Sequence, residues 1–136
     1  MTADLWRHAL GVHWLLDAWG CEKSELATLD TLESALLGLC ETLGLTRVGS
    51  PQLCGPDSGS LMGIVLISES HLSLHAYPST GRLHADLFSC APFDPKIALA
   101  YLRKTYAFDA FEERLVRRGE RMHSALYGGG VADSGA

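Results

Sequence analysis

The centre of the chain reads Met62-Gly-Ile-Val-Leu-Ile-Ser-Glu-Ser-His-Leu-Ser-Leu-His-Ala-Tyr77, then Pro-Ser-Thr-Gly81, then Arg82-Leu-His-Ala-Asp-Leu-Phe-Ser-Cys90. Apolar residues dominate the first six positions and alternate with polar ones from His71 onward, which predicts one long β-strand over 62–77. The Pro-Ser-Thr-Gly sequence is typical of a tight turn. The alternation that resumes after it predicts a second strand over 83–88. We therefore expect an antiparallel hairpin with its turn at 78–81.

The sequence on either side of this hairpin predicts elements of both kinds. A leucine stripe indicates an amphipathic helix that Ser24 caps and Gly44 ends. Asp94 and Pro95 open a second helix, because proline is tolerated in a first helical turn. Alternating segments predict three further strands, at 9–16, 45–53 and 108–116, and residues 128–136 are expected to be a disordered tail. The stripe consists of Leu26, Leu29, Leu32, Leu36, Leu39 and Leu43.

This order of elements predicts an α+β two-layer sandwich, in which an antiparallel sheet carries both helices on one face. The chain has 136 residues, about the usual size of one domain, so we expect a single domain over residues 1–127. The other face of the sheet would need a cover. A second copy of the chain could supply it, so we expect a homodimer.

The composition excludes several classes of partner. The chain has 11 basic and 16 acidic residues and a formal net charge of −5, whereas nucleic acids and anionic membranes favour a basic face. Its longest apolar run, from Leu61 to Ile67, is far shorter than the ~20 residues of a membrane helix. No export signal is visible, so we expect a cytoplasmic protein with reduced cysteines.

The predicted turn sets a register between the two strands of the hairpin. If Tyr77 pairs with Arg82, a cysteine lies beside the Glu69–Ser70 peptide bond and shares its face with two histidines and an aspartate. Ser70 and His75 have opposite parity in a regular strand, so we expect a bulge or bend at 68–70. A solvated sheet face is the alternative explanation of the polar residues. The pairs in this register are His75 with His84, Ser73 with Asp86, and Glu69 with Cys90.

Two motifs of the chain resemble the bacterial and archaeal S-adenosylmethionine decarboxylase family: Gly63-Ile-Val-Leu-Ile-Ser-Glu-Ser-His-Leu-Ser-Leu-His75 and Asp86-Leu-Phe-Ser-Cys90. The family signature reads roughly G-V-V-x-I-S-E-S-H-x-x-I-H-T-W-P-E, followed by D-x-F-T-C. Weaker similarity extends from Arg7 and His8 through the second predicted helix. The combination of the two motifs is specific to this family.

The resemblance implies a self-processing enzyme with a pyruvoyl cofactor. Ser70 would attack the carbonyl of Glu69, and elimination would release chain 1–69 and leave pyruvoyl at the start of chain 70–136. His75 would move a proton during this elimination, and Cys90 would return a proton to the substrate. The pyruvoyl ketone would form a Schiff base with the substrate amine and accept electrons as CO₂ leaves. Neither a metal ion nor pyridoxal phosphate is then expected. His71 and Ser73 belong to the signature, and a structural role is expected for each.

The substrate-reading positions of the family are altered in this chain. The family pattern H-x-F-x-P-x-G-V-S-G supplies an aromatic residue that stacks on adenine, but this chain has Pro56 there and Met62 in place of the serine. The family's W-P-E is Tyr77-Pro-Ser79 here, so the carboxylate that holds the ribose is missing. Base stacking contributes about 1–3 kcal/mol, so these losses would weaken nucleoside binding.

These departures favour a decarboxylase of L-arginine or L-ornithine that makes agmatine or putrescine for polyamine biosynthesis. Asp57, Tyr77 and Asp86 are its expected substrate contacts. One alternative is an S-adenosylmethionine decarboxylase with a divergent pocket, which would supply decarboxylated S-adenosylmethionine for spermidine synthesis. Another is a non-catalytic homologue that serves as a binding or regulatory subunit. The presence of Glu69, Ser70, His75 and Cys90 together argues against that last possibility.

Overall fold

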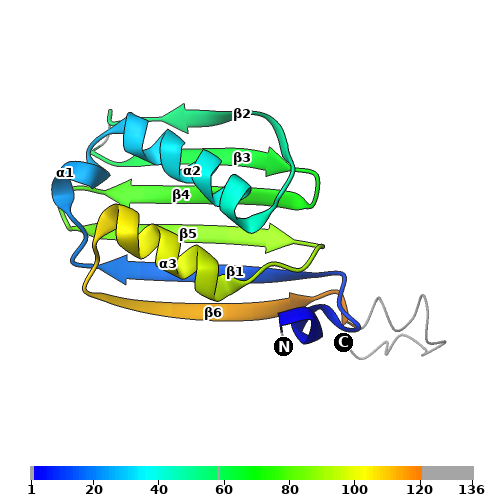
Figure 1. The fold of residues 1–136 in the computed structure, drawn as a ribbon. Helices are drawn as coiled ribbons and strands as arrows, with labels where there is room; N and C mark the ends of the chain where they lie inside the picture. The colour runs from blue at the N-terminus through cyan, green and yellow to red at the C-terminus, as the bar shows by residue number, and fades with distance from the viewer. Residues whose placement is uncertain (1, 58, 121–136) are drawn as a thin grey trace, which may run out of the picture.

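A six-stranded antiparallel sheet carries two long helices on one of its faces (Figure 1). The computed structural model describes residues 2–57 and 59–120. The α+β two-layer sandwich expected from the sequence is confirmed. The strands are β1 (Gly11–Trp19), β2 (Arg47–Cys54), β3 (Leu61–Ile67), β4 (Ser70–Tyr77), β5 (Arg82–Ser89) and β6 (Ala110–Arg118), and the helices are a 3₁₀ turn (Thr2–Trp6), α1 (Lys23–Leu26), α2 (Leu29–Leu43) and α3 (Pro95–Tyr106).

The strands lie in the order β2-β3-β4-β5-β1-β6. Strands β4 and β5 form the hairpin whose turn was predicted at 78–81, with Tyr77 opposite Arg82. The predicted register is confirmed, since His75 pairs with His84 and Ser73 pairs with Asp86. Strand β1 pairs with β5 on one side and with β6 on the other, so the first and last strands of the sandwich complete the sheet.

The prediction of one long strand over 62–77 is wrong. Strand β3 ends at Ile67, and β4 begins at Ser70 and runs back antiparallel to it, with Ile67 opposite Ser70. The change of direction takes place at Ser68 and Glu69, where the sequence had indicated a bulge or bend. The alternation on the two sides of this short turn reads as continuous, and neither glycine nor proline marks the reversal.

The helices begin and end at residues with ordinary capping chemistry. Helix α2 ends at Gly44, as predicted, and this residue adopts the left-handed conformation with φ 71°. It begins one turn later than expected, because the Thr28 side chain rather than Ser24 caps it, accepting a hydrogen bond from Thr31 N (3.1 Å). In α3 the Asp94 side chain accepts a hydrogen bond from Lys96 N (2.9 Å), with Pro95 in the first turn as predicted.

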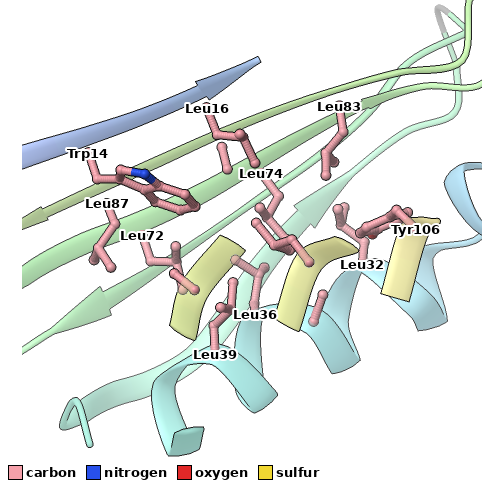
Figure 2. Close-up of a cluster of buried hydrophobic side chains, with 14 of the residues drawn as sticks. Trp14, Leu16, Leu32, Leu36, Leu39, Leu72, Leu74, Leu83, Leu87 and Tyr106 are labelled. Atoms are coloured by element: carbon pink, nitrogen blue, oxygen red, sulfur yellow. The ribbon is translucent and has the colours of Figure 1, made fainter. Parts of the chain in front are cut away.

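The core fills the space between the sheet and the two helices (Figure 2). Alternate residues of each central strand are buried there, as with Leu72 and Leu74 of β4, which are fully buried. Leu36 of α2 packs over Gly63 of β3, where an added Cβ would come within 2.8 Å of Leu36 Cδ1. The glycine therefore allows the helix to approach the sheet closely.

Within residues 2–57 and 59–120, no helix lies over the opposite face of the sheet, here called the open face (Figure 1). It carries His71, Ser73, His75 and Tyr77 of β4, which alternate with the buried leucines and are half-buried. No helix within residues 2–57 and 59–120 is both long and apolar enough to cross a membrane. The tail predicted over 128–136 lies outside the described residues.

The core predicts a large difference between two aliphatic side chains of the helices. Leu36→Ala should lower the free energy of unfolding by about 2–5 kcal/mol, because it leaves a cavity between α2 and β3. Ile97→Ala on α3 should change it by less than about 1 kcal/mol, because Ile97 is 43% exposed. Urea unfolding followed by circular dichroism, with both changes made in a Ser70→Ala chain that stays whole, would measure this. Equal effects would contradict the core assignment.

Candidate active site

The predicted cleavage point lies in the two-residue turn between β3 and β4. Backbone atoms of Thr46, just before β2, hold this turn on one side: Ser68 N–H donates to the Thr46 carbonyl (2.8 Å), and Thr46 N–H donates to Glu69 Oε1 (3.1 Å). On the other side, Cys90 N–H donates to the Glu69 carbonyl oxygen (3.1 Å). The Glu69–Ser70 peptide is therefore held from both sides, and the predicted pairing of Glu69 with Cys90 is confirmed.

The hydrogen bond from Cys90 N–H acts on the carbonyl group that Ser70 was predicted to attack. An N–H group that binds such an oxygen polarises the carbonyl and stabilises the negative charge that develops on it during acyl transfer. The contact comes from the backbone, so it is set by the β4–β5 register and not by the Cys90 side chain. The chain thus provides an oxyanion donor at this peptide bond.

The Ser70 hydroxyl lies next to an imidazole ring of the same strand. Ser70 Oγ is 3.2 Å from His71 Nδ1, and both residues are half-buried. The His71 ring lies on the open face near Phe88 of β5, at a centroid distance of 6.1 Å, and His13 of β1, at 6.5 Å. A hydroxyl group and an imidazole are thereby brought within hydrogen-bond distance at the predicted cut.

The His13 ring makes a polar contact as well as packing near His71. His13 Nε2 is 3.1 Å from Asp86 Oδ1, and the His13 and Asp86 side chains are 22% and 30% exposed. This contact joins β1 to β5 in the middle of the open face. Asp86, predicted as a substrate contact, therefore has a partner within the chain.

A second polar group lies at the opposite end of the open face. His75 pairs with His84, whose ring lies 5.0 Å from the Tyr77 ring, measured between centroids. Asp17 Oδ1 of β1 lies 3.9 Å from His84 Nε2. Asp57 is exposed in the loop before β3, at this same end of the strands. The expected substrate contacts Tyr77 and Asp57 therefore lie away from Ser70.

The predicted site residues thus fall into two groups that one chain keeps apart. His75 is five residues beyond Ser70 on β4, which corresponds to about 16 Å at the ~3.3 Å rise of a strand residue. Glu69, Ser70 and Cys90 form one group, and His75 and Tyr77 belong to the other. Within one chain, His75 cannot reach the Ser70 hydroxyl.

Apolar side chains occupy the open face beside the polar ones. Met62, Ile64 and Leu66 of β3 point to this face and are exposed, with Leu66 59% accessible, and Val48 of β2 lies next to Leu66. A shallow depression of about 380 Å³ lies over β2 and β3, and none of the predicted site residues lines it. A cluster of exposed apolar side chains on a sheet face, such as this one, is typical of a surface that another protein covers.

The four cysteines divide into a buried and an exposed pair, and all four are free thiols. Burial raises the pKa of Cys21 to about 11, with a smaller contribution from the charge of Asp109. Burial likewise raises the pKa of Cys40. Both thiols therefore stay protonated at neutral pH and belong to the core. Cys54 and Cys90 are exposed, so Cys90 is the one thiol near Glu69–Ser70 that a substrate could reach.

The sequence did not predict the contacts of three residues near the cleavage point. Thr46 contributes only backbone atoms, which leave no signal in the sequence. No motif of the sequence marks His13, because its contact with Asp86 depends on a pairing between strands that are far apart in the chain. His71 was expected to be structural, although its place next to Ser70 in the sequence was a usable signal.

Residues 12–119 match the S-adenosylmethionine decarboxylase family. Arg7 and His8 lie outside the matched range. The chain is 31% identical over 119 residues to the S-adenosylmethionine decarboxylase proenzyme of Thermoplasma acidophilum, covering 85% of this chain and 88% of that one. It is 30% identical over 111 residues to the S-adenosylmethionine decarboxylase proenzyme of Bacillus velezensis, covering 81% of this chain and 86% of that one.

A solved structure shares the fold. The crystal structure of the adenosylmethionine decarboxylase from Aquifex aeolicus superposes with a TM-score of 0.72, at 24% sequence identity. The superposition covers 81% of this chain and 91% of that chain. The two-layer arrangement is therefore one that a solved decarboxylase also adopts.

Proposed function

The chain belongs to the S-adenosylmethionine decarboxylase family, and from this premise we propose that it is a proenzyme that cuts itself between Glu69 and Ser70. It is a pyruvoyl-dependent decarboxylase of polyamine biosynthesis, and Ser70 is the source of the pyruvoyl group. Residues 1–69 and 70–136 are the two chains of the processed enzyme, which together form the domain. The single observation that carries this proposal is the hydrogen bond from Cys90 N–H to the Glu69 carbonyl at the predicted cut.

The surroundings of Ser70 fit a pyruvoyl group. Ser70 begins a strand whose ladder bonds to β3 and β5 hold it after the preceding peptide is broken. The exposed Cys90 thiol lies at the same end of the sheet and is placed to give a proton to the substrate. A pyruvoyl group, once formed, takes up the electron pair that is released when CO₂ leaves the substrate.

The separation of Ser70 from His75 supports a homodimer as the active unit. A two-fold axis that runs between two open faces, perpendicular to their strands, places the Ser70 end of each protomer over the His75 end of its partner. The exposed Met62, Ile64 and Leu66 would then be buried between the two sheets. In this dimer, His75 of one chain lies beside Ser70 of the other chain and moves the proton during the elimination there.

We propose S-adenosylmethionine as the substrate, because the curated relatives quoted above carry that activity in their names. The half-buried Tyr77 offers an aromatic face in place of the one lost at Pro56. The carboxylate of Asp17, near His84, lies on the same face as Tyr77. An aromatic ring and a carboxylate suit both the adenine ring and the positive charge of a sulfonium.

A basic amino acid is the second candidate substrate. Pro56 and Ser79 remove the adenine stack and the ribose carboxylate of the family pattern. The carboxylates of Asp17 and Asp86 remain on the open face and would attract a guanidinium or ammonium group. L-arginine and L-ornithine are therefore kept as alternatives, and Asp57 is too exposed in its loop to be the main contact.

Self-cleavage gives the first prediction of this proposal. Purified protein should separate into chains of residues 1–69 and 70–136, and the second should begin with a blocked, pyruvoyl-bearing residue. Ser70→Ala should stay whole, because no hydroxyl group is left to attack Glu69. Intact mass spectrometry after prolonged incubation measures both. A wild-type chain that remains uncut with a free Ser70 hydroxyl would exclude the proposed function.

The dimer predicts that two inactive chains complement each other. A His75→Ala chain should process slowly by itself. Its cleavage should recover when it is co-expressed with Ser70→Ala, because the mixed dimer has one intact site. The double variant Ser70→Ala/His75→Ala is the matched control and should give no recovery. Gel electrophoresis of tagged chains measures the cut fraction, and light scattering measures the mass. Lack of recovery in a protein with dimer mass would contradict this arrangement.

The substrate assignment predicts a clear ranking. We expect kcat/KM for S-adenosylmethionine to exceed that for L-arginine and L-ornithine by at least ~100-fold, or about 2.7 kcal/mol. The measurement is release of labelled CO₂ from each substrate by the processed enzyme. Tyr77→Ala should lower kcat/KM for S-adenosylmethionine by ~10-fold or more, as expected for a lost stacking contact. The opposite ranking would establish the second candidate and leave the decarboxylase chemistry intact.

A further inference from the structure

The attack of Ser70 on Glu69 requires a group that removes the hydroxyl proton. A serine hydroxyl is a weak nucleophile unless an adjacent base accepts its proton. The hydrogen bond that the structure gives to Ser70 Oγ joins it to His71 Nδ1, at 3.2 Å. His75 is about 16 Å away along the same strand at the usual rise. Within the same chain, the base in reach of the Ser70 hydroxyl is therefore His71. The His75 that would approach Ser70 in the proposed dimer comes from the other protomer, and its expected role is in the later elimination.

Two aromatic rings lie beside the His71 ring on the β5 and β1 side of the sheet. Phe88 of β5 and His13 of β1 lie next to it, at centroid distances of 6.1 and 6.5 Å. His13 is itself held by Asp86, at 3.1 Å. On the β3 side, Leu66 is the cross-strand neighbour of His71. These neighbours form the surroundings of the His71 ring beside Ser70.

Three charged groups surround this arrangement. The Glu69 carboxylate is held by Thr46 N–H, the Asp86 carboxylate acts through His13, and the Arg118 guanidinium lies over the Phe88 ring at 5.0 Å. The negative charges of Glu69 and Asp86 would attract a positive charge that forms at His71 during the attack, and the positive charge of Arg118 would oppose them.

We propose that His71 is a catalytic residue of self-cleavage that acts on Ser70 of its own chain, an inference that rests on the proposed self-processing. As Ser70 Oγ bonds to the Glu69 carbonyl carbon, its proton passes to His71 Nδ1, and the negative oxygen is held by Cys90 N–H. When the intermediate collapses, the C–N bond breaks and the Ser70 nitrogen takes the proton back from His71. The product is an ester with a free amine, and no proton is gained or lost overall.

The test measures self-cleavage in the full-length chain carrying His71→Asn. Asparagine places an oxygen near the position of Nδ1 and can accept the hydrogen bond, but it cannot take up the proton. We expect the rate to fall by about 10²–10⁴-fold, the usual contribution of a general base. His8→Asn is the matched control. His8 is exposed before β1 at φ 59°, a conformation that asparagine tolerates, so its rate should stay within about 2-fold of wild type.

Hydroxylamine separates the two steps of processing, because it cleaves an ester and leaves an amide intact. His71→Asn should be cleaved no faster with hydroxylamine than without it, since formation of its ester becomes the slow step and the ester does not accumulate. His75→Asn should accumulate the ester and be cleaved by hydroxylamine. Faster cleavage of His71→Asn with hydroxylamine than without it, or a rate within about 3-fold of wild type, would overturn the proposal.

Co-expression decides whether His71 acts within its own chain. Ser70→Ala should not restore the cleavage of a His71→Asn partner, although it should restore that of a His75→Ala partner. Recovery of the His71→Asn chain would overturn the proposal. If His71→Asn does not fold, His71→Ala with added imidazole replaces it, and cleavage that imidazole does not raise would count against a base role. An uncut wild-type chain would instead refute the proposed self-processing itself.

Discussion

The pairing register of β4 with β5 is the constraint on which the rest of the molecule depends. It places the Glu69 carbonyl against Cys90 N–H and assigns His71 and His75 to the open face. A slip of one residue between the two strands would turn either these histidines or Asp86 toward α2 and α3 and would bring leucines of that strand to the open face. Burial of unpaired polar groups in that core would cost several kcal/mol. The core therefore protects the geometry of the site, although it shares no side chain with it.

This register could be predicted because its determinants are local. The turn at 78–81 joins two strands with clear alternation, and the pairing of His75 with His84 follows from counting outward from it. The reversal at Ser68 and Glu69 was only partly foreseen, since a two-residue link between two alternating segments resembles a bend in one strand. The start of α2 was misplaced for a related reason. Both Ser24 and Thr28 can cap a helix, and tertiary packing selects between them.

The parts of the site that could not be predicted all depend on distant pairing or on backbone atoms. The contact of His13 with Asp86 needs β1 to lie beside β5, and 73 residues separate the two side chains in the chain. The support from Thr46 comes from its backbone and would be the same for most other residues. The motif contains both His71 and His75, but it does not show that His71 lies against Ser70 while His75 is too far from it. Only the straight course of β4 makes that distinction.

Because the link between β3 and β4 is short, folding would have to come before self-cleavage, and the cleaved protein would refold less readily than its precursor. While residues 68–70 are continuous, the two strands are tethered at a very high effective concentration, and the ladder between them forms within one molecule. A cut in this link would leave the native ladders in place but remove the tether. Reassembly after unfolding would then require two separate chains to meet, so thermal stability would depend on protein concentration. The cleaved protein would thus persist because it unfolds slowly, whereas the uncut precursor is the form that folds efficiently.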